Sequence, residues 1–515
     1  TDNVTNKMVF KGNIEYLTEN EIGIRLRATQ QNPSVLPAES LYAIEHDTMD
    51  TTFRSMYQGL YAYLSARKER RDLLLSQRPP RFDESLDSMI SRSEDDFTRI
   101  ALKAKAAQDY FLLIGPPGTG KTSCALKKMV ETFHTDKDAQ ILLLSYTNRA
   151  VDEICKSLAS IAPAVDFIRV GSELSCDEAY RGHLIENELS SCNRRSEVYE
   201  RIRNCRIIVG TVAAISGKPE LFRLKHFDVA IIDEATQILE PQLLGILCVR
   251  GEDGKDAIDK FVLIGDHKQL PAVVQQNTEQ SAIYDESLLS IGLTNLKDSL
   301  FERLYRNCTA TVHRSYDMLC RQGRMHPEVA LFANRAFYGG RLIPVGLPHQ
   351  IESSDTICRL AFYPSVPEKA GASAKINYSE ARIVADLAAR IYEDHQTDFD
   401  ESRTLGIITP YRSQIALIKK EIESLGIPAL NRILVDTVER FQGSERDVII
   451  YSFCVNYPYQ LKFLSNLTEE EGVLIDRKLN VALTRARKQM FITGVPELLE
   501  RNPLYKSLLK LIESF

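Results

Sequence analysis

Residues 115–122 constrain this chain more than any other segment, because they read GPPGTGKT directly after the apolar run 111–114. A buried strand, a glycine-rich turn and a helix predicted over 123–133 form the context that a phosphate-binding loop requires. The glycines let backbone N–H groups close around phosphates, and the helix N-terminus adds a partial positive charge. The sequence therefore predicts a nucleoside triphosphatase. Its expected loop contacts are Gly115, Pro116, Pro117, Gly118, Thr119, Gly120, Lys121 and Thr122.

Two side chains of this loop and two acidic side chains later in the chain have predicted roles in hydrolysis. We expect Lys121 to reach the β- and γ-phosphates and Thr122 to place its hydroxyl on Mg²⁺. Asp233 and Glu234 follow the apolar strand predicted at 229–232. Asp233 can hold Mg²⁺ through water, and Glu234 can orient and deprotonate the water that attacks the γ-phosphate. The expected cofactors are therefore ATP and Mg²⁺.

The composition is that of a globular protein without a membrane segment. Hydrophobic residues make up 44% of the 515 residues and charged residues 26%, which are ordinary values. No apolar stretch approaches the ~20 residues that cross a bilayer. The ten cysteines include no CxxC pair, which favours reduced thiols in an intracellular protein, cytoplasmic if bacterial and nuclear if eukaryotic. The net charge of −6 means that any basic track for nucleic acid must be local.

Residues 1–107 are expected to form accessories to the nucleotide-binding part. Alternation of apolar and polar residues over 1–30, with Val9 as its first apolar member, predicts a small antiparallel barrel at 1–48. This barrel is either a packing module or an arm that faces nucleic acid. Residues 49–107 turn helical and are expected to form a stalk. The charge run 67–71 is typical of a solvated face, with nucleic-acid contact as the alternative.

From residue 108 onward strands and helices alternate, which predicts an α/β fold of parallel sheets with helices on both faces. We place a first lobe at 108–300, interrupted by a mostly helical insertion at 171–204, and a second lobe at 301–515. Residues 345–378 are expected to be loop-rich. The predicted strands of the two lobes are 111–114, 141–144, 167–170, 207–209, 229–232, 261–264, 405–408, 448–452 and 491–494, and the predicted helices are 123–133, 149–159, 381–392 and 413–425.

The segment 265–271, GDHKQLP, resembles the third motif of superfamily 1 helicases, which lies between ATP and nucleic acid. Gln269 in this segment is placed to sense the γ-phosphate and the attacking water. The other motifs follow in the family's order. They are SYTNRAVD at 145–152, VGTV at 209–212, RQGRMHP at 321–327, TPYRSQ at 409–414, VDTVERFQGSE at 435–445 and NVALTRAR at 480–487.

The resemblance implies two RecA-like lobes that share one nucleotide. Arg324 and Arg485 lie in the second lobe, and guanidinium groups that reach across the cleft can stabilise charge on the transferring phosphoryl group. Glu445 is implied as a further nucleotide contact, and the role of Arg487 stays open between catalysis and a structural ion pair. Closure of the lobes around ATP would ratchet a bound strand.

The resemblance also implies a set of nucleic-acid contacts, most of them small and neutral. Hydroxyls, amides and backbone N–H groups can hold phosphates without reading bases, which suits an acidic chain that must slide along any sequence. Tyr411 is either a base-stacking residue or a tyrosine with a bonded hydroxyl, and the same holds for Tyr146. The implied contacts are Thr147, Asn148, Thr211, Thr409, Tyr411 and Thr437.

The barrel, stalk and insertion resemble superfamily 1B, in the branch that contains the nonsense-mediated-decay RNA helicase and the replication helicase–nuclease. That branch moves 5′ to 3′, and the chain is most similar to the helicase half of the helicase–nuclease. Single-stranded DNA is favoured over RNA as the partner. The alternatives are an RNA or hybrid helicase and an ATP-gated clamp that remodels nucleoproteins. The segments that carry this likeness are LSYT at 144–147, AVD at 150–152, DFIRVG at 166–171, GDHKQLP at 265–271 and SLFERL at 299–304.

Three features set limits on this resemblance. Gly323 stands where the family has an adenine-stacking tyrosine, and Thr98 stands where a glutamine would read adenine. ATP, GTP and other nucleotides therefore stay open as substrates. No nuclease motif is visible, and because the first residue is Thr1, a nuclease domain or partner outside this sequence stays open as well.

Overall fold

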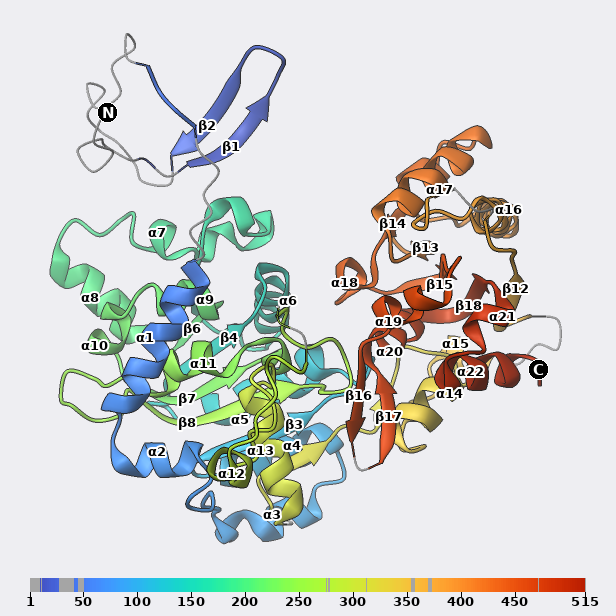
Figure 1. The fold of residues 1–515 in the computed structure, drawn as a ribbon. Coiled ribbons are helices and arrows are strands. Elements are labelled where there is room, and N and C mark those ends of the chain that lie inside the picture. Colours follow the sequence, from blue (N-terminus) through green and yellow to red (C-terminus); the bar gives the residue numbers. More distant parts are fainter. Residues whose placement is uncertain are drawn as a thin grey trace. The chain divides into compact units, whose positions relative to one another are not determined.

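A parallel sheet of seven strands carries the phosphate-binding loop, and a parallel sheet of five strands follows it in the chain (Figure 1). This computed structural model describes residues 10, 12–26, 41–44, 51–274, 276, 278–311, 313–352, 357–368, 373–470 and 472–514. The first sheet has the order β5-β6-β4-β7-β8-β3-β9 and the second the order β12-β18-β15-β13-β14. The strands of the first sheet are β3 (Tyr110–Ile114), β4 (Ile141–Ser145), β5 (Phe167–Val170), β6 (Ile207–Thr211), β7 (Phe227–Ile232), β8 (Ile258–Gly265) and β9 (Tyr316–Met318). Those of the second are β12 (Leu360–Pro364), β13 (Leu405–Ile408), β14 (Leu434–Asp436), β15 (Arg446–Ser452) and β18 (Ala486–Gly494).

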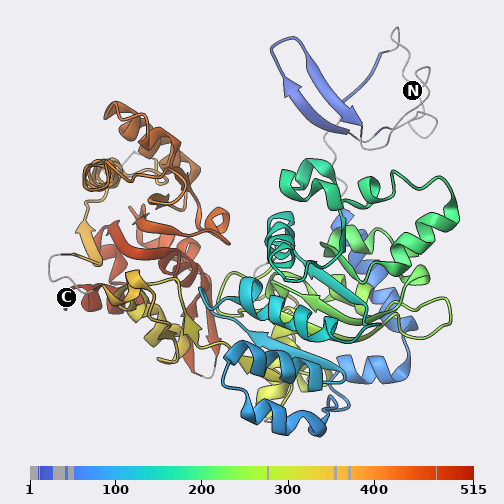
Figure 2. The same cartoon turned by 180° about the vertical axis from the view of Figure 1, so that it is seen from behind.

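Both faces of the first sheet are buried, which explains why its strands are continuous apolar runs. Leu112 and Ile114 of β3 join the core on one face, whereas Phe111 and Leu113 join the core on the other. Helices cover both faces, as the views from the front and from behind show (Figures 1 and 2). On one face lie α4 (Asp96–Ala106), α5 (Lys127–His134) and α6 (Asn148–Ala159), and on the other α9 (Val212–Ser216), α11 (Glu240–Leu247) and α13 (Leu300–Ala310).

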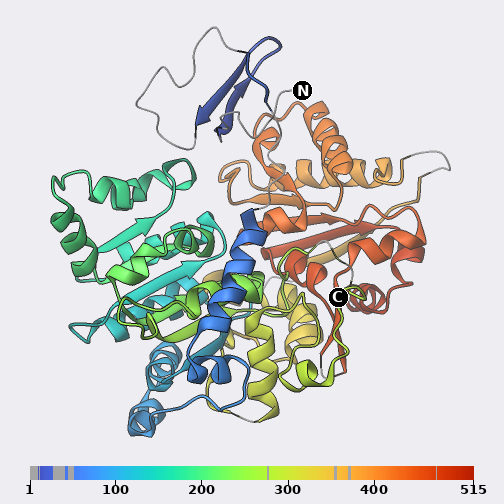
Figure 3. The ribbon, with the colours of Figure 1, turned by 60° about the vertical axis from the view of Figure 1, so that its left-hand side comes forward.

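The second sheet is covered in the same way, and its strands appear in orange and red in Figure 3. Ile449 and Tyr451 of β15 belong to one core, and Val448 and Ile450 to the other. The prediction of an α/β fold with two parallel-sheet lobes is therefore confirmed. One face carries α14 (Pro327–Tyr338), α20 (Arg477–Leu483) and α22 (Pro503–Ile512), and the other carries α16 (Tyr378–Asp394) and α17 (Arg412–Ser424).

The first lobe extends further along the chain than the predicted boundary at residue 300. β9 pairs in parallel with β3, with Leu112 opposite Tyr316. α13, which precedes β9, buries Leu300 and Phe301 in the core of the first lobe. The boundary therefore lies after β9. This strand is three residues long and only half-buried, so it lacks the apolar run that identifies the other strands.

The remaining elements connect or extend the two lobes. Between β5 and β6, the predicted insertion contains α7 (Ile185–Glu188) and α8 (Arg195–Asn204). The segment expected to be loop-rich contains β12, an edge strand that pairs with β18. The other elements of the main unit are α1 (Thr51–Ser65), α2 (Lys68–Leu74), α3 (Asp87–Arg92), α10 (Glu220–Leu224), α12 (Glu286–Ser290), α15 (Pro348–Ile351), α18 (Val438–Phe441), α19 (Leu461–Leu464), α21 (Pro496–Leu499), β10 (Arg321–Gln322), β11 (Ile343–Pro344), β16 (Leu467–Glu470) and β17 (Val473–Asp476).

The chain divides into an N-terminal unit, Thr1–Thr51, and a main unit, Thr52–Phe515. In the N-terminal unit, β1 (Gly12–Leu17) and β2 (Ile22–Leu26) form an antiparallel hairpin whose turn is closed by a bond from Thr18 N to Glu21 O of 2.9 Å. Val9 and residues 27–40 and 45–48 of the predicted barrel lie outside the described residues, so the barrel stays a prediction. Nowhere in the described part of the chain is a helix long and apolar enough to cross a membrane.

The segment predicted as a stalk packs against the first lobe. Arg70 is buried and donates from NH2 to the carbonyl oxygens of Ile258 and Asp259, so the charge run 67–71 is not a uniformly solvated face. α1 crosses α11 where two glycines face each other. A Cβ atom on Gly59 would lie 1.8 Å from Pro241 O, and one on Gly245 would lie 3.3 Å from the Cα of Gly59. Only glycine permits this approach.

We expect Gly59→Ala to lower the free energy of unfolding by about 1–2 kcal/mol. Overpacking costs about 1–3 kcal/mol, and the higher helix propensity of alanine returns up to ~1 kcal/mol. Gly182→Ala is the control, because a methyl group there would meet no atom within 4 Å. Thermal unfolding and limited proteolysis of α1 measure the difference. Equal stability of Gly59→Ala and wild type would contradict the close contact between α1 and α11.

Candidate functional site

The phosphate-binding loop joins β3 to a π-helical turn, η4 (Lys121–Leu126), which precedes α5. Gly118 and Gly120 have φ angles of +74° and +76°, a conformation that favours glycine. A Cβ atom on Gly115 would lie 2.0 Å from Cγ of Lys121, so the loop closes tightly around the lysine side chain. The helix predicted after the loop thus begins with the π-helical turn η4 and continues as α5. Such π-helical turns are frequent at functional sites.

The two acidic residues after β7 face this loop, as predicted. Asp233 is buried and accepts from Thr122 Oγ1 at 2.5 Å. Burial first, and the neighbouring Glu234 second, raise the pKa of Asp233 to about 6, against the effects of Thr122 and Lys121. The Nζ of Lys121 lies 4.0 Å from Glu234 Oε1. Gln237 donates to the other carboxylate oxygen of Glu234 at 2.9 Å, which fixes the direction of this carboxylate.

Gln269 joins the first lobe to the second. Its Nε2 donates to Asp266 Oδ2 at 2.8 Å, and its Oε1 accepts from NH2 of Arg485 at 3.2 Å. Arg485 is 2% exposed. Burial, followed by repulsion from Arg324, lowers the pKa of Arg485 to about 9, so the guanidinium stays protonated at neutral pH. Gln269 and Arg485, two of the predicted site residues, are therefore in direct contact.

The second predicted arginine lies against the phosphate-binding loop itself. Gly323 N donates to Gly118 O at 2.8 Å. A Cβ atom on Gly118 would lie 2.4 Å from the Cβ of Arg324. Arg324 donates from Nε to Glu445 Oε2 at 2.5 Å and from NH1 to the carbonyl oxygen of Thr484 at 3.2 Å. The backbone of the second lobe thus touches the loop that grips phosphates.

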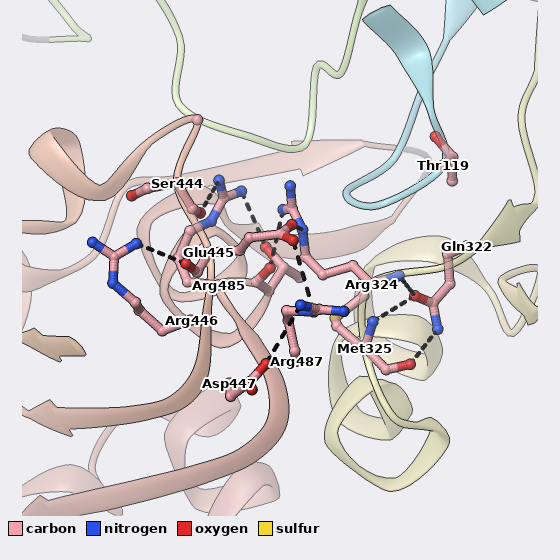
Figure 4. A network of polar contacts seen from close by, with 12 residues as sticks. Thr119, Gln322, Arg324, Met325, Ser444, Glu445, Arg446, Asp447, Arg485 and Arg487 are labelled. Atoms are coloured by element: carbon pink, nitrogen blue, oxygen red, sulfur yellow. Dashed lines mark hydrogen bonds and ion pairs between the residues drawn. The ribbon is translucent and has the colours of Figure 1, made fainter. Parts of the chain in front are cut away.

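The carboxylate of Glu445 lies among three arginines of the second lobe, Arg324, Arg485 and Arg487 (Figure 4). Burial raises its pKa, but Arg324, Arg487 and Arg485 outweigh burial, so the net pKa is lowered and the carboxylate stays ionised. Arg487 lies 3.7 Å from Glu445 and 3.5 Å from Asp447. In this conformation Arg487 therefore makes ion pairs within the second lobe, and a catalytic role for it stays untested.

A buried polar seam continues the contact between the lobes. Tyr338 OH donates to Asp266 Oδ2 at 2.7 Å and accepts from Asn480 Nδ2 at 2.8 Å. Asn480 also donates to the carbonyl oxygen of Lys268 at 2.6 Å, and Lys268 Nζ donates to that of Phe337 at 2.7 Å. Tyr338 was not predicted from the sequence, because an isolated tyrosine at a helix end carries no signal. Asn480 is the first residue of a segment that resembles a helicase motif, so the sequence did carry a signal for it.

The residues expected at nucleic acid follow neighbouring strands in each lobe. In the first sheet Ser145 of β4 pairs with Thr211 of β6. Thr147 and Thr211 cap the helices that follow, accepting from backbone N–H groups at 3.2 and 3.1 Å. In the second sheet Ile408 of β13 pairs with Asp436 of β14, so Thr409 and Thr437 begin adjacent loops. The carboxyl ends of parallel strands meet at one edge, where ligands of α/β proteins bind.

Not every expected contact is accessible. Thr409 is fully buried, and its hydroxyl has no hydrogen-bond partner among the described groups. Its predicted contact with a phosphate is therefore not available in this conformation, because the side chain is packed inside the lobe. Thr211 is 7% exposed. Asn148, Tyr411 and Thr437 are half-buried and Thr147 is exposed.

The two departures at the base position also have structural counterparts. Thr98 donates to Asp95 Oδ2 at 2.6 Å as part of the cap of α4. A side chain at Gly323 would come within 3.2 Å of Leu347 Cδ1. Val345 and Leu347 therefore occupy the region directly beside Gly323, and Leu347 also lines an open cavity of about 510 Å³. The cavity is lined by Leu347, Pro348, His349, Glu352, Arg403, Arg487 and Lys488.

Comparisons with known proteins match the chain to two family models and to several relatives. One family model described as an AAA domain matches residues 296–497, and a second with the same description matches 91–195 and 185–277. The DNA replication ATP-dependent helicase/nuclease DNA2 of Homo sapiens is 28% identical, over 93% of this chain and 46% of its own length. The corresponding protein JHS1 of Arabidopsis thaliana is 27% identical over 99% of this chain and 38% of its own length.

Two further likenesses extend the comparison. The DNA polymerase alpha-associated DNA helicase A of Saccharomyces cerevisiae is 24% identical over 81% of this chain and 67% of its own length. A solved arterivirus nonstructural protein 10 (helicase) with DNA covers 81% of this chain at 15% identity, and its TM-score of 0.39 is too low to inform the site. The chain spans less than half the length of the DNA2 relatives.

We expect Tyr338→Phe to reduce the kcat of nucleotide hydrolysis about tenfold with little change in KM. Losing one hydrogen bond to a charged group costs about 1.5–3 kcal/mol, and 1.36 kcal/mol is a tenfold change in rate. Tyr505→Phe is the matched control, since Tyr505 donates to Asp476 within the second lobe at 3.0 Å. Both variants should lose similar thermal stability, and only Tyr338→Phe should lose turnover. Wild-type kcat in both would mean that the seam is purely structural.

Proposed function

Because the chain belongs to the superfamily 1B helicases of the Dna2-like branch, we propose that it hydrolyses ATP to move 5′ to 3′ along single-stranded DNA and unwind duplexes. The single observation that carries this proposal is that the second lobe contacts the predicted phosphate-binding loop and Gln269 of the first lobe. The first lobe supplies the phosphate-binding loop, and the second supplies Arg324 and Arg485. Arg324 meets the loop at Gly118, and Arg485 meets Gln269.

The residues present fit a magnesium nucleotide. Thr122 and Asp233 place a hydroxyl and a carboxylate oxygen 2.5 Å apart, and oxygen ligands are the kind that Mg²⁺ prefers. When bound, the ion would neutralise charge on the β- and γ-phosphate oxygens. Lys121 would bind the same phosphates. Glu234, held by Gln237, would take the proton from the attacking water.

The two arginines give hydrolysis a dependence on the position of the lobes. Arg324 now holds Glu445, and Arg485 now holds Gln269. A γ-phosphate between the lobes would compete with these partners and draw both guanidinium groups toward the loop. Loss of that phosphate would return them to Glu445 and Gln269. Each turnover would therefore close and reopen the two lobes.

The same closure would move a bound strand. Thr147 and Thr211 belong to the first lobe, and Tyr411 and Thr437 to the second, so a change in the distance between lobes changes the distance between their grips. The threonines among them would hold phosphates without reading bases. DNA is favoured as the substrate because the relatives are named DNA helicases, and this substrate would place the protein inside the cell. The proposal covers the helicase activity alone.

We expect Glu234→Gln to bind nucleotide normally and to lose turnover by about 10²–10⁴-fold, because the geometry stays while the base is removed. Lys121→Ala is the contrasting variant and should lose affinity for ATP as well. Nucleotide binding by calorimetry and steady-state ATPase rates separate the two effects. Equal loss of binding in both variants would speak against Glu234 as the group that activates water.

The substrate and polarity are tested on partial duplexes with 5′ or 3′ single-stranded tails, made of DNA or RNA. We expect ATP-dependent opening of 5′-tailed DNA, with Lys121→Ala as the inactive control. Equal opening of RNA would support the RNA helicase alternative. If no duplex opens while streptavidin is displaced from a biotinylated strand, the remodelling clamp is the better description.

A further inference from the structure

Three aromatic side chains lie on one short segment of the second lobe, directly after β15. Tyr457 directly precedes the turn η9 (Pro458–Gln460), Tyr459 lies within this turn, and Phe463 lies in α19. Tyr459 is 55% exposed and Phe463 is 68% exposed. The rings of Tyr457 and Tyr459 stack with centroids 5.7 Å apart and planes 14° apart. We call these three residues the aromatic platform.

The platform is held on an ordered backbone by a buried glutamine. Gln460 Oε1 accepts from the backbone N–H groups of Asn456 and Tyr457, each at 2.9 Å. Its Nε2 donates to Ala374 O at 2.7 Å and to Tyr411 OH at 3.2 Å. The apolar Leu464 anchors the other end of the segment in the core. The backbone that carries the exposed rings is therefore held in place, and the ring of Tyr459 also stacks on that of Tyr457.

The segment lies between the two motifs of the second lobe that are implied at nucleic acid. On one side Gln460 bonds Tyr411 of the motif after β13. On the other side Lys478 Nζ lies 3.5 Å from Phe463 O and 3.2 Å from Glu439 Oε1. Glu439 stands two residues after Thr437 in the second motif. The platform segment therefore contacts the first of these motifs directly and the second through Lys478, and Lys462 within it is also exposed.

We propose that Tyr459 and Phe463 stack on bases of the single strand held by the second lobe, an inference that rests on the proposed helicase function. Aromatic faces hold any base, because every base has a π-face. The threonines grip phosphates and the platform grips bases, and neither reads sequence. A docking face for another protein is the competing explanation for exposed aromatic rings. Their place between two nucleic-acid motifs favours the strand.

The absence of tryptophan from the chain allows a direct spectroscopic test. Tyr459→Trp introduces a single indole at the platform, and stacking on a base should quench its fluorescence when oligothymidylate is added. An abasic strand of the same length should bind without quenching. Tyr57→Trp is the matched control, because Tyr57 on α1 is 73% exposed and lies outside both motifs. Quenching at position 57 alone, or at neither position, would overturn the platform.

Affinity provides the second readout. Stacking is worth about 1–3 kcal/mol per base, so Tyr459→Ala and Phe463→Ala should each raise the Kd for oligothymidylate at least about fivefold. Their Kd for the abasic strand should not change. Tyr459→Phe and Phe463→Tyr keep a ring and should bind as wild type.

The outcomes separate this inference from the function on which it rests. Wild-type protein that binds no single strand, or shows no strand-stimulated ATPase, would contradict the helicase itself. Wild-type protein that binds oligothymidylate and abasic strand equally would overturn the platform alone. Alanine variants that bind both strands as wild type would also overturn it and would favour the protein-docking explanation.

Discussion

Gln269 is one of the buried polar contacts by which the two lobes are joined. Its amide is held by Asp266 of the first lobe and by Arg485 of the second. Arg485 is buried and also donates to the carbonyl oxygens of Val481 and Ser444 within the second lobe, so separating the lobes would remove one of several partners of its guanidinium. A nucleotide phosphate is a stronger partner for the same guanidinium. The lobes are therefore stable in the present arrangement, yet ready to exchange one set of charge partners for another.

The parallel sheets explain why so many motifs gather around this contact. Every strand of a parallel sheet ends at the same edge, so each loop after a strand adds its side chains to one line. The phosphate-binding loop follows β3, the acidic pair follows β7, and the motif with Gln269 follows β8. In the second sheet, the loops that follow β13, β14 and β15 lie in the same way along one edge. The residues predicted at nucleotide and those predicted at nucleic acid are thus neighbours along the edges of two sheets, which a buried polar seam joins.

Long apolar strands and complete motifs could be predicted from the sequence, because both carry strong local signals. The strands β3, β5 and β13 lie where continuous apolar runs indicated them. β9 and β12 escaped prediction, since a half-buried strand and an edge strand lack such runs. In the site, Lys121, Glu234, Arg324 and Arg485 were identified by motif. The burial of Thr409 and the bond from Tyr338 to Asp266 arise from tertiary packing, which no local pattern encodes.

Gly323 links the nucleotide site to the way in which strands are held. Its N–H bonds the loop carbonyl of Gly118, and its missing side chain removes the ring that stacks on adenine in the family. If no other ring takes its place, such a site would hold its nucleotide chiefly by the phosphates and would discriminate weakly between bases. The proposed strand contacts would follow the same principle, with hydroxyls for phosphates and flat rings for base faces. A motor that must advance over any sequence needs grips that do not depend on base edges.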